Sequence, residues 1–365
     1  MPSLPELAEI DQLIAAGGVH LDARVACHVS QGGHALPVPV ITLGNPDPAV
    51  PAFGVFGGVH GLERIGVQVV LAFLRSLVER LPHDRALHAR LERMRLVLMP
   101  LVNPGGVSAG TRANPQGVDL MRNAPLDAAE RSLFMVGGQR LGPGLPWYRG
   151  AAGAPMQAES AALCRVVDEE LLGHRVSIAL DCHSGFGLVD RLWFPWAHTR
   201  QPAPHLAEFH ALGEALLGAA RDRRDRTIFE PQNLRYLAHG DLWDHLYLLA
   251  GARPGRLLLP LTLEMGSWRW VHRNPRQALQ APGLFNPPAL RLAGVLRRQA
   301  ARLDRLCALA ADAAEWLPVG ARREALRVRA LARWYGHVAA RPGALAPTPS
   351  PHAPAGAWGL PWVGR

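Results

Sequence analysis

The chain has 365 residues, of which 48% are hydrophobic and 19% are charged. This balance is ordinary for a globular protein, excludes a fibrous or wholly disordered chain, and allows one large α/β domain or two smaller ones. The net charge is +9, and all of the basic residues behind it are arginines. The densest runs of arginine, 221–226 and 322–333, are helix-like segments mixed with acids or leucines, so a basic stripe for nucleic acid is not expected.

Strand-like and helix-like segments alternate along most of the chain. In chain order we expect strands at 23–29, 36–43 and 52–56, a helix at 62–81, a strand at 94–101, a helix at 157–172, a strand at 176–182, helices at 205–222 and 241–250, and a strand at 257–264. The first two strands form an antiparallel pair around Gly32-Gly33-His34. The later alternation predicts a mostly parallel sheet with helices on both faces.

The composition changes beyond residue 285. Residues 288–340 are rich in Ala, Leu and Arg and read as helical, whereas the last residues are rich in Pro, Gly and Ala. We therefore predict an α/β domain at 1–285, a helical extension packed on it at 286–341, and a poorly ordered tail at 342–365.

Polar residues follow or end four of the expected strands. His60 comes after the strand at 52–56, Asn103 after the next, His183 after the third, and Glu264 ends the fourth. Open α/β sheets bind ligands at the carboxyl ends of their strands. We expect these four side chains to meet at one edge of the sheet.

Three of the candidate residues have the chemistry of a zinc site. His60 and Glu63 stand three residues apart, and His183 adds a second imidazole. Such a set supplies three ligands and leaves the fourth position of a catalytic zinc for water. The HxxE pattern alone occurs often by chance, and Asp181 could simply hold His183, so the prediction depends on all three residues together.

The wider pattern resembles the zinc metallocarboxypeptidases of the carboxypeptidase A-like family and their bacterial peptidase relatives. The matching segments keep the family's order and span roughly residues 50–270: His60-x-x-Glu63, Asn103-Pro104-Gly105-Gly106, Arg112, Gly117-Val118-Asp119-Leu120-Met121-Arg122-Asn123, Asp181-Cys182-His183-Ser184, Tyr236-x-Ala238-x-Gly240 with Asp244, and Thr262-Leu263-Glu264. The resemblance implies a single α/β domain around a mixed, mostly parallel sheet of about eight strands, a helical C-terminal extension, and one zinc ion per chain.

The resemblance also implies a catalytic role for several residues. It makes His60, Glu63 and His183 the zinc ligands. Glu264 is expected to be the general base, because a carboxylate across the cleft can take a proton from the attacking water and return it to the leaving nitrogen. Arg112 is expected to stabilise the developing oxyanion.

Other residues are expected to bind substrate or to support the ligands. The resemblance implies that Arg122 binds the substrate's terminal carboxylate, which suits a planar guanidinium. Asn103 and Tyr236 are expected to contact the substrate, and Asp119 to orient His60. The resemblance also implies that Trp243 occupies the position that sets side-chain preference in the family, and because it offers no charge we expect no preference for Lys or Arg.

The expected activity is zinc-dependent hydrolysis of an amide bond in a peptide or peptide-like substrate with a free carboxylate, by a promoted-water mechanism. Met121 stands where the family usually has Asn, which removes one hydrogen bond to a terminal carboxylate. An N-acyl amino acid deacylase of the aspartoacylase or desuccinylase type is therefore an alternative. A non-catalytic binding module is a second alternative, whose mark would be the loss of a ligand or of the base.

The four cysteines are widely spaced and form no CxxC pair, which argues against a disulfide framework and fits a reducing compartment. The first residues lack a basic region followed by an apolar core, and no uninterrupted apolar run reaches ~20 residues. We expect a cytoplasmic protein without a membrane partner. The sequence does not indicate an oligomeric state.

Overall fold

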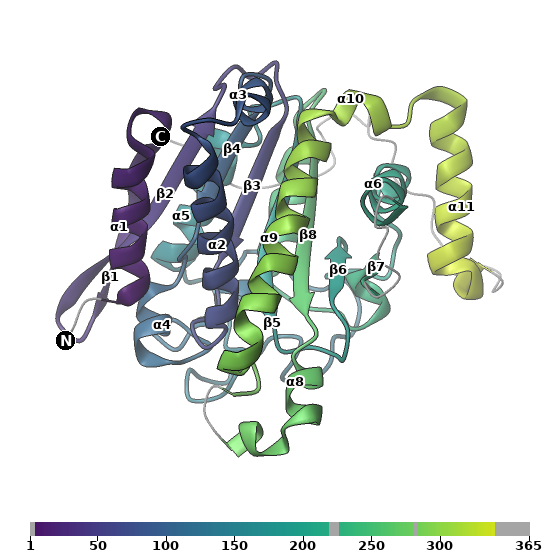
Figure 1. Ribbon diagram of the computed structural model, residues 1–365. Helices are drawn as coiled ribbons and strands as arrows, with labels where there is room; N and C mark the ends of the chain where they lie inside the picture. Colours follow the sequence, from purple (N-terminus) through teal and green to yellow (C-terminus); the bar gives the residue numbers. More distant parts are fainter. Residues whose placement is uncertain (1–3, 219–225, 280–282, 340–365) are drawn as a thin grey trace.

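A mixed β-sheet runs through the centre of the protein. The computed structural model describes residues 4–218, 226–279 and 283–339 (Figure 1). Within these residues the sheet has eight strands in the order β1-β2-β4-β3-β5-β8-β6-β7. The strands are β1 (Asp22–Gln31), β2 (His34–Gly44), β3 (Ala52–Gly57), β4 (Arg95–Met99), β5 (Val176–Ser184), β6 (Arg191–Phe194), β7 (Ile228–Pro231) and β8 (Leu257–Met265). The central strands β4, β3, β5 and β8 are parallel, which confirms the expected fold class.

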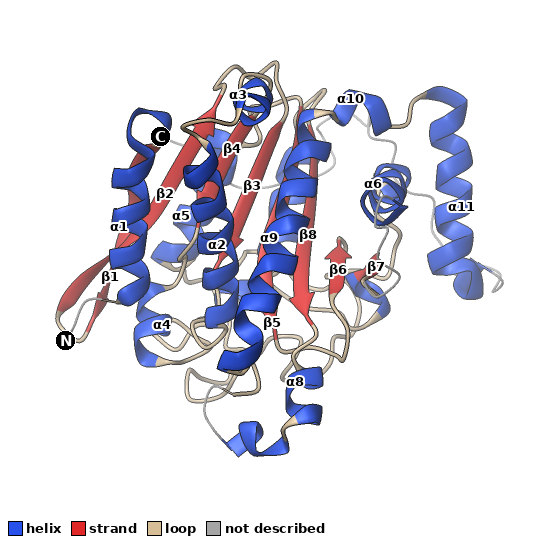
Figure 2. Ribbon diagram, in the orientation of Figure 1, coloured by secondary structure: helices blue, strands red, loops and turns tan. Residues whose placement is uncertain are grey.

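Helices cover both faces of this sheet (Figure 2). One face carries α1 (Pro5–Gly17), α2 (Arg64–Arg80), α6 (Leu206–Gly218) and α9 (Ala289–Ala311), with α11 (Gly320–Ala339) packed on α6; the other carries α5 (Ala158–Glu170) and α7 (Leu242–Gly251). The short helices are α3 (Arg85–Leu91), α4 (Pro104–Ala109), α8 (Trp268–Arg273) and α10 (Ala313–Trp316), and the 3₁₀ helices are η1 (Gly18–His20), η2 (Leu120–Arg122), η3 (Gln232–Leu234) and η4 (Pro275–Leu279).

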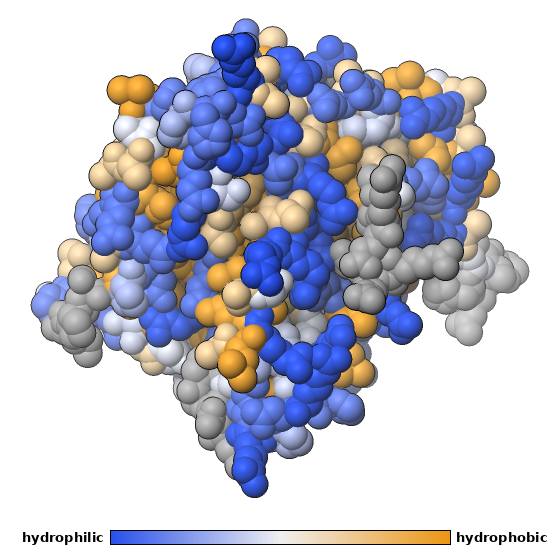
Figure 3. All heavy atoms as spheres, in the orientation of Figure 1, coloured by the Kyte–Doolittle hydropathy of each residue, from blue (hydrophilic) through white to orange (hydrophobic). Residues whose placement is uncertain are grey.

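The C-terminal helices belong to the same apolar core as the sheet. Leu303 of α9 and Trp334 of α11 are buried in one cluster with residues of α2 and β3. The surface over α2 and α9 mixes hydrophilic residues with hydrophobic and weakly polar ones (Figure 3). The domain boundary expected between residues 285 and 286 stays a prediction. The tail expected at 342–365 lies outside the described residues. Across the described ranges, we find no helix with the length and apolar character needed to cross a membrane.

The structure differs from the expected elements in a few places. It adds α1, α3, β6 and β7, and both of these strands have only four residues, too few for a clear alternating pattern. β4 ends at Met99 rather than at 101, because Pro100 has no N–H to donate to a neighbouring strand. Part of the helix expected at 205–222 lies outside the described residues.

The strand register brings the candidate residues to one edge of the sheet. In the parallel pair of β5 and β8, His183 lies opposite Glu264. A Cβ atom on Gly61, between the two residues of the HxxE motif, would lie 1.9 Å from the backbone of Gly106. The HxxE loop can therefore pack on the Asn103-Pro104-Gly105-Gly106 turn only with glycine at position 61.

Candidate active site

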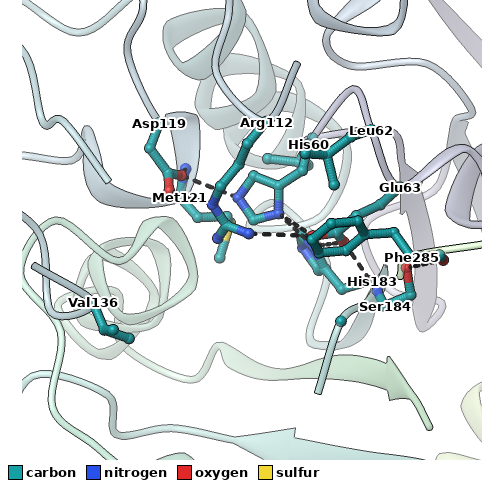
Figure 4. A network of polar contacts seen from close by, with 12 residues as sticks. His60, Leu62, Glu63, Arg112, Asp119, Met121, Val136, His183, Ser184 and Phe285 are labelled. Carbon is teal, nitrogen blue, oxygen red and sulfur yellow. Dashed lines mark hydrogen bonds and ion pairs between the residues drawn. The ribbon is translucent and has the colours of Figure 1, made fainter. Parts of the chain in front are cut away.

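Three ligand-type side chains converge at the carboxyl ends of β3 and β5 (Figure 4). The Nδ1 atom of His60 lies 3.0 Å from Oε1 of Glu63 and 3.2 Å from Nδ1 of His183. The other oxygen of Glu63, Oε2, lies 3.1 Å from His183 Nδ1. It also accepts a hydrogen bond from the backbone N–H of Ser184. All three side chains are buried, so their mutual approach is enforced by the fold.

This geometry fits a zinc ion. Two imidazole nitrogens and a carboxylate are a common donor set for catalytic zinc, although other divalent ions accept it. Four bonds of ~2.0–2.1 Å in a tetrahedron place ligand atoms roughly 3.3 Å apart. The contacts of 3.0, 3.1 and 3.2 Å are close to that value, with a different oxygen of Glu63 facing each histidine, and one ligand atom from each residue lies within 4.8 Å of the others. His60, Glu63 and His183 could therefore hold the ion with little rearrangement.

The electrostatics of the three residues also favour a bound cation. Burial alone would disfavour a charged Glu63, but His60 and His183 outweigh burial and hold the pKa of Glu63 well below its ordinary value. Burial likewise opposes a charge on His183, but Asp181 and Glu63 raise its pKa well above the ordinary range. The site stabilises positive charge between its ligand atoms, and a divalent ion can supply that charge in place of protons.

Asp119 and Arg112 support the ligand His60. Oδ1 of Asp119 lies 3.0 Å from Nε2 of His60, and Oδ2 accepts from Nε of Arg112 at 2.8 Å. Burial opposes ionisation of Asp119, but Arg112 and His60 outweigh it, so the pKa of this carboxyl lies well below its usual value. Arg112 also reaches Oε1 of Glu63 at 3.3 Å. The guanidinium is thus held beside the ligand cluster.

Arg122 is a buried cation with no carboxylate at ion-pair distance within the described ranges, and its side chain is 3% exposed. Its guanidinium donates to the backbone carbonyls of Met121 and Val136, at 3.1–3.3 Å. Its Cζ lies 5.9 Å from the ring centre of Tyr236. The backbone of Arg122 in turn requires Gly240, because a Cβ there would lie 1.9 Å from the Arg122 carbonyl oxygen.

Glu264 faces the site from β8. Its Oε2 is buried and has no hydrogen-bond partner among the described residues. Burial and the nearby charge of Glu63 raise its pKa to about 8. Burial raises the pKa of Tyr236; the charge of Arg122 opposes this shift, and the charge of Glu264 adds to it. A partly buried carboxylate next to a cluster of metal-ligand side chains is well suited to proton transfer.

Two residues expected to contact substrate lie in the buried frame of the site. Both polar atoms of the Asn103 side-chain amide bind the backbone. Oδ1 accepts a hydrogen bond from the backbone N–H of Gly106 at 2.8 Å, and Nδ2 donates one to the carbonyl of Val59. Trp243 is 3% exposed and packs edge-on against Phe56. Both side chains are thus engaged within the protein, and the substrate contacts expected from the sequence for Asn103 and Trp243 stay predictions.

Sequence reasoning missed two features that border the ligands. The indole of Trp243 donates to Asp181, which lies beside His183. Phe285 lies near Glu63 (Figure 4), and its carbonyl accepts from the Ser184 hydroxyl at 2.7 Å. The Asp-x-His spacing could have pointed to the first feature. No signal marked Phe285, because it lies outside every matching segment.

A cavity of about 470 Å³ borders Arg112 and Asp119. The wall of the cavity includes Trp147, whose backbone φ of 60° lies in the left-handed region. The ring centre of Trp147 lies 6.0 Å from Cζ of Arg112. Strained backbone of this kind often occurs at functional sites. The cavity therefore offers room for a ligand group next to Arg112.

Comparisons with known proteins agree with this geometry. A family model described as zinc carboxypeptidase matches residues 26–269. Carboxypeptidase SOL1 of Arabidopsis thaliana is 35% identical over 77 residues, which make up 21% of this chain and only 16% of that relative's length.

Solved structures share the fold. Bovine thrombin-activatable fibrinolysis inhibitor, in complex with tick carboxypeptidase inhibitor, gives a TM-score of 0.61 at 16% identity, over 84% of this chain and 95% of that one. Carboxypeptidase A from Helicoverpa armigera gives 0.57 at 15% identity, over 84% and 72% of the two chains. At these identities the likeness is one of fold.

We predict that Glu264 makes the stability of the metal-free protein depend on pH. In the folded state the Glu264 carboxyl group has a pKa of about 8, whereas in the unfolded chain it loses its proton near pH 4.3. The folded state therefore binds more protons between these values, and the free energy of unfolding should fall as pH rises through them. At about 1.4 kcal/mol per pKa unit, the expected loss is on the order of a few kcal/mol.

Urea unfolding of the chelator-treated protein between pH 5 and 8 measures this dependence. The Glu264→Gln variant should show a clearly flatter pH profile, and saturating zinc should also flatten it, because the cation lowers the pKa of the carboxyl group. Equal slopes for the wild type and the variant would show that Glu264 does not hold the proton.

Proposed function

The chain belongs to the zinc carboxypeptidase family, and on that premise we propose that this zinc metallopeptidase hydrolyses an amide bond in a peptide or peptide-like substrate with a free carboxylate. One observation carries the proposal: Arg122, a buried guanidinium without a carboxylate partner in the described part of the chain, shares a site with the ligand cluster and Glu264. A buried cation of this kind calls for an anionic ligand.

The hydrolytic step uses the residues around the ligand cluster. A zinc ion held by His60, Glu63 and His183 supplies Lewis acidity, which polarises a carbonyl and lowers the pKa of water. Glu264 accepts a proton from the attacking water and passes it to the leaving nitrogen. The unpartnered Oε2 of Glu264 supports this role, because it is free to receive that proton.

Arg112 is the group that we propose to stabilise the developing oxyanion. Its bonds to Asp119 and Glu63 hold the guanidinium beside the ligands before any substrate arrives. Preorganised charge of this kind contributes most where the carbonyl oxygen gains charge in the transition state. Burial opposes the charge on Arg112, but Asp119 and Glu63 keep its pKa above the ordinary value, so the side chain stays a cation.

Arg122 is the group that we propose to bind the substrate carboxylate. Three of its five N–H groups donate to backbone carbonyls and fix the plane of the guanidinium. The other two remain for a carboxylate or for the neighbouring Tyr236, 5.9 Å away, which we propose covers bound substrate. A group on the acyl side of the scissile bond would occupy the cavity beside Arg112.

An N-acyl amino acid deacylase is the second candidate function. The specific observation is Met121, which is 5% exposed and packs in the core, and whose side chain offers no hydrogen-bond donor beside Arg122. A small acyl amino acid still has the carboxylate that Arg122 would bind. A non-catalytic binding role has less support, because the expected ligands and base are all present. The cytoplasmic location stays a prediction.

We predict that Glu264→Gln reduces kcat by about 10²- to 10⁴-fold, because the amide cannot accept a proton from water. Zinc content should stay at the wild-type level, since Glu264 is not a ligand. Turnover of a mixed pool of peptides and N-acyl amino acids, followed by mass spectrometry with and without a chelator, gives the readout. Normal turnover by the variant would refute the assignment of the base.

We predict that Arg122→Ala raises KM for substrates with a free carboxylate by 10-fold or more, as expected from the loss of a charge-assisted hydrogen bond. KM for the matching C-terminal amides should change little. Arg93→Ala is the matched control, because Arg93 is exposed and pairs with Asp312. Equal losses on acids and amides would argue against the carboxylate-binding role.

A further inference from the structure

We propose that Trp243 and Asp181 are positioning residues that hold His183 ready to bind the metal. Nε1 of Trp243 donates to Oδ2 of Asp181 at 2.9 Å, and the same oxygen lies 2.8 Å from Nε2 of His183. The other ring nitrogen of His183, Nδ1, faces the ligand cluster. The inference rests on the assignment of His183 as a ligand in the proposed function, and it gives Trp243 a role that differs from the expected substrate contact.

Burial makes each contact in this chain of residues specific. Trp243, Asp181 and His183 are 3%, 0% and 2% exposed, so water cannot replace a lost partner. An indole N–H is only a donor, and it therefore requires an acceptor such as Oδ2 of Asp181. Nε2 of His183 makes no aligned hydrogen bond within the described ranges, but Oδ2 of Asp181, 2.8 Å away, is the acceptor that favours a hydrogen on this nitrogen. That tautomer leaves the lone pair of Nδ1 free for a metal ion.

The strands and α7 fix these residues relative to one another. Asp181 and His183 are two residues apart on β5, so their side chains share a face of the sheet. Phe56 is the register partner of Asp181 on β3, and its ring packs edge-on against Trp243 at 4.9 Å. The indole thus has packed neighbours that hold its N–H toward Asp181.

The two histidine ligands are supported by different kinds of partner. Asp119, beside His60, is bound by the cation Arg112, which offsets the charge of that carboxylate. Asp181, beside His183, is bound by the neutral donor Trp243, and its Oδ1 has no hydrogen-bond partner within the described ranges. A neutral donor can orient the carboxylate without offsetting its charge.

The test measures zinc affinity by competition with a chromophoric chelator, on the full chain and without substrate. Asp181→Asn should weaken zinc binding by about 10- to 100-fold. Trp243→Phe should weaken it by about 2- to 10-fold, as expected from the loss of one neutral hydrogen bond. In the Asp181→Asn background, Trp243→Phe should have no further effect, because its action passes through Asp181.

Trp316→Phe is the matched control, since Trp316 is another buried tryptophan whose Nε1 donates, at 2.7 Å, to the carbonyl of Leu309. It should leave zinc affinity unchanged, and a merely structural role of Trp243 would make the two Phe variants alike. The inference is overturned if they affect zinc affinity equally, or if Trp243→Phe acts equally in both backgrounds. If Asp181→Asn does not fold, the two Phe variants alone decide. Because no turnover is measured, a failure of the proposed activity would not affect the result.

Discussion

Three buried side chains whose nitrogen and oxygen atoms approach one another to 3.0–3.2 Å are the constraint around which the site is organised. Two imidazole nitrogens and a carboxylate at this separation need positive charge between them, and the surrounding residues prepare for it. Asp119 and Asp181 lie behind His60 and His183, with a carboxylate oxygen 3.0 and 2.8 Å from the outer ring nitrogen of each. The folded protein therefore maintains an arrangement whose stability depends on a cation, which is the usual link between metal binding and folding.

The sheet makes this arrangement possible at low conformational cost. Parallel pairing sets His183 opposite Glu264, so ligand and base are fixed by the same backbone hydrogen bonds. Glycine at 61 and at 240 allows loops to touch where any side chain would collide. One of these contacts holds the HxxE loop, and the other holds the backbone of Arg122. Rigid positioning of this kind is what efficient catalysis requires of a site.

The sequence predicted residues whose position follows from strand ends. His60, His183 and Glu264 all come at the end of an apolar run, and parallel pairing brings such residues to one edge. The position of Trp243 could not be predicted in this way, because a motif gives the order of residues and not the direction in which a helix turns each side chain. β6 and β7 were missed because four residues carry too little periodicity, and Phe285 because tertiary packing alone places it by the site.

On the proposed function, the two positive groups serve different ends, Arg112 the reaction and Arg122 the recognition of substrate. Arg112 is bound to Asp119 and Glu63 beside the ligands, whereas Arg122 keeps N–H groups for an anion.

The proposed roles of these residues require one metal ion at the ligand cluster. The most direct test is a calorimetric zinc titration of the chelator-treated protein and of its His183→Ala variant. We expect one zinc ion per wild-type chain and at least a 100-fold loss of zinc affinity in the variant. Absence of binding, or equal binding by both proteins, would contradict it.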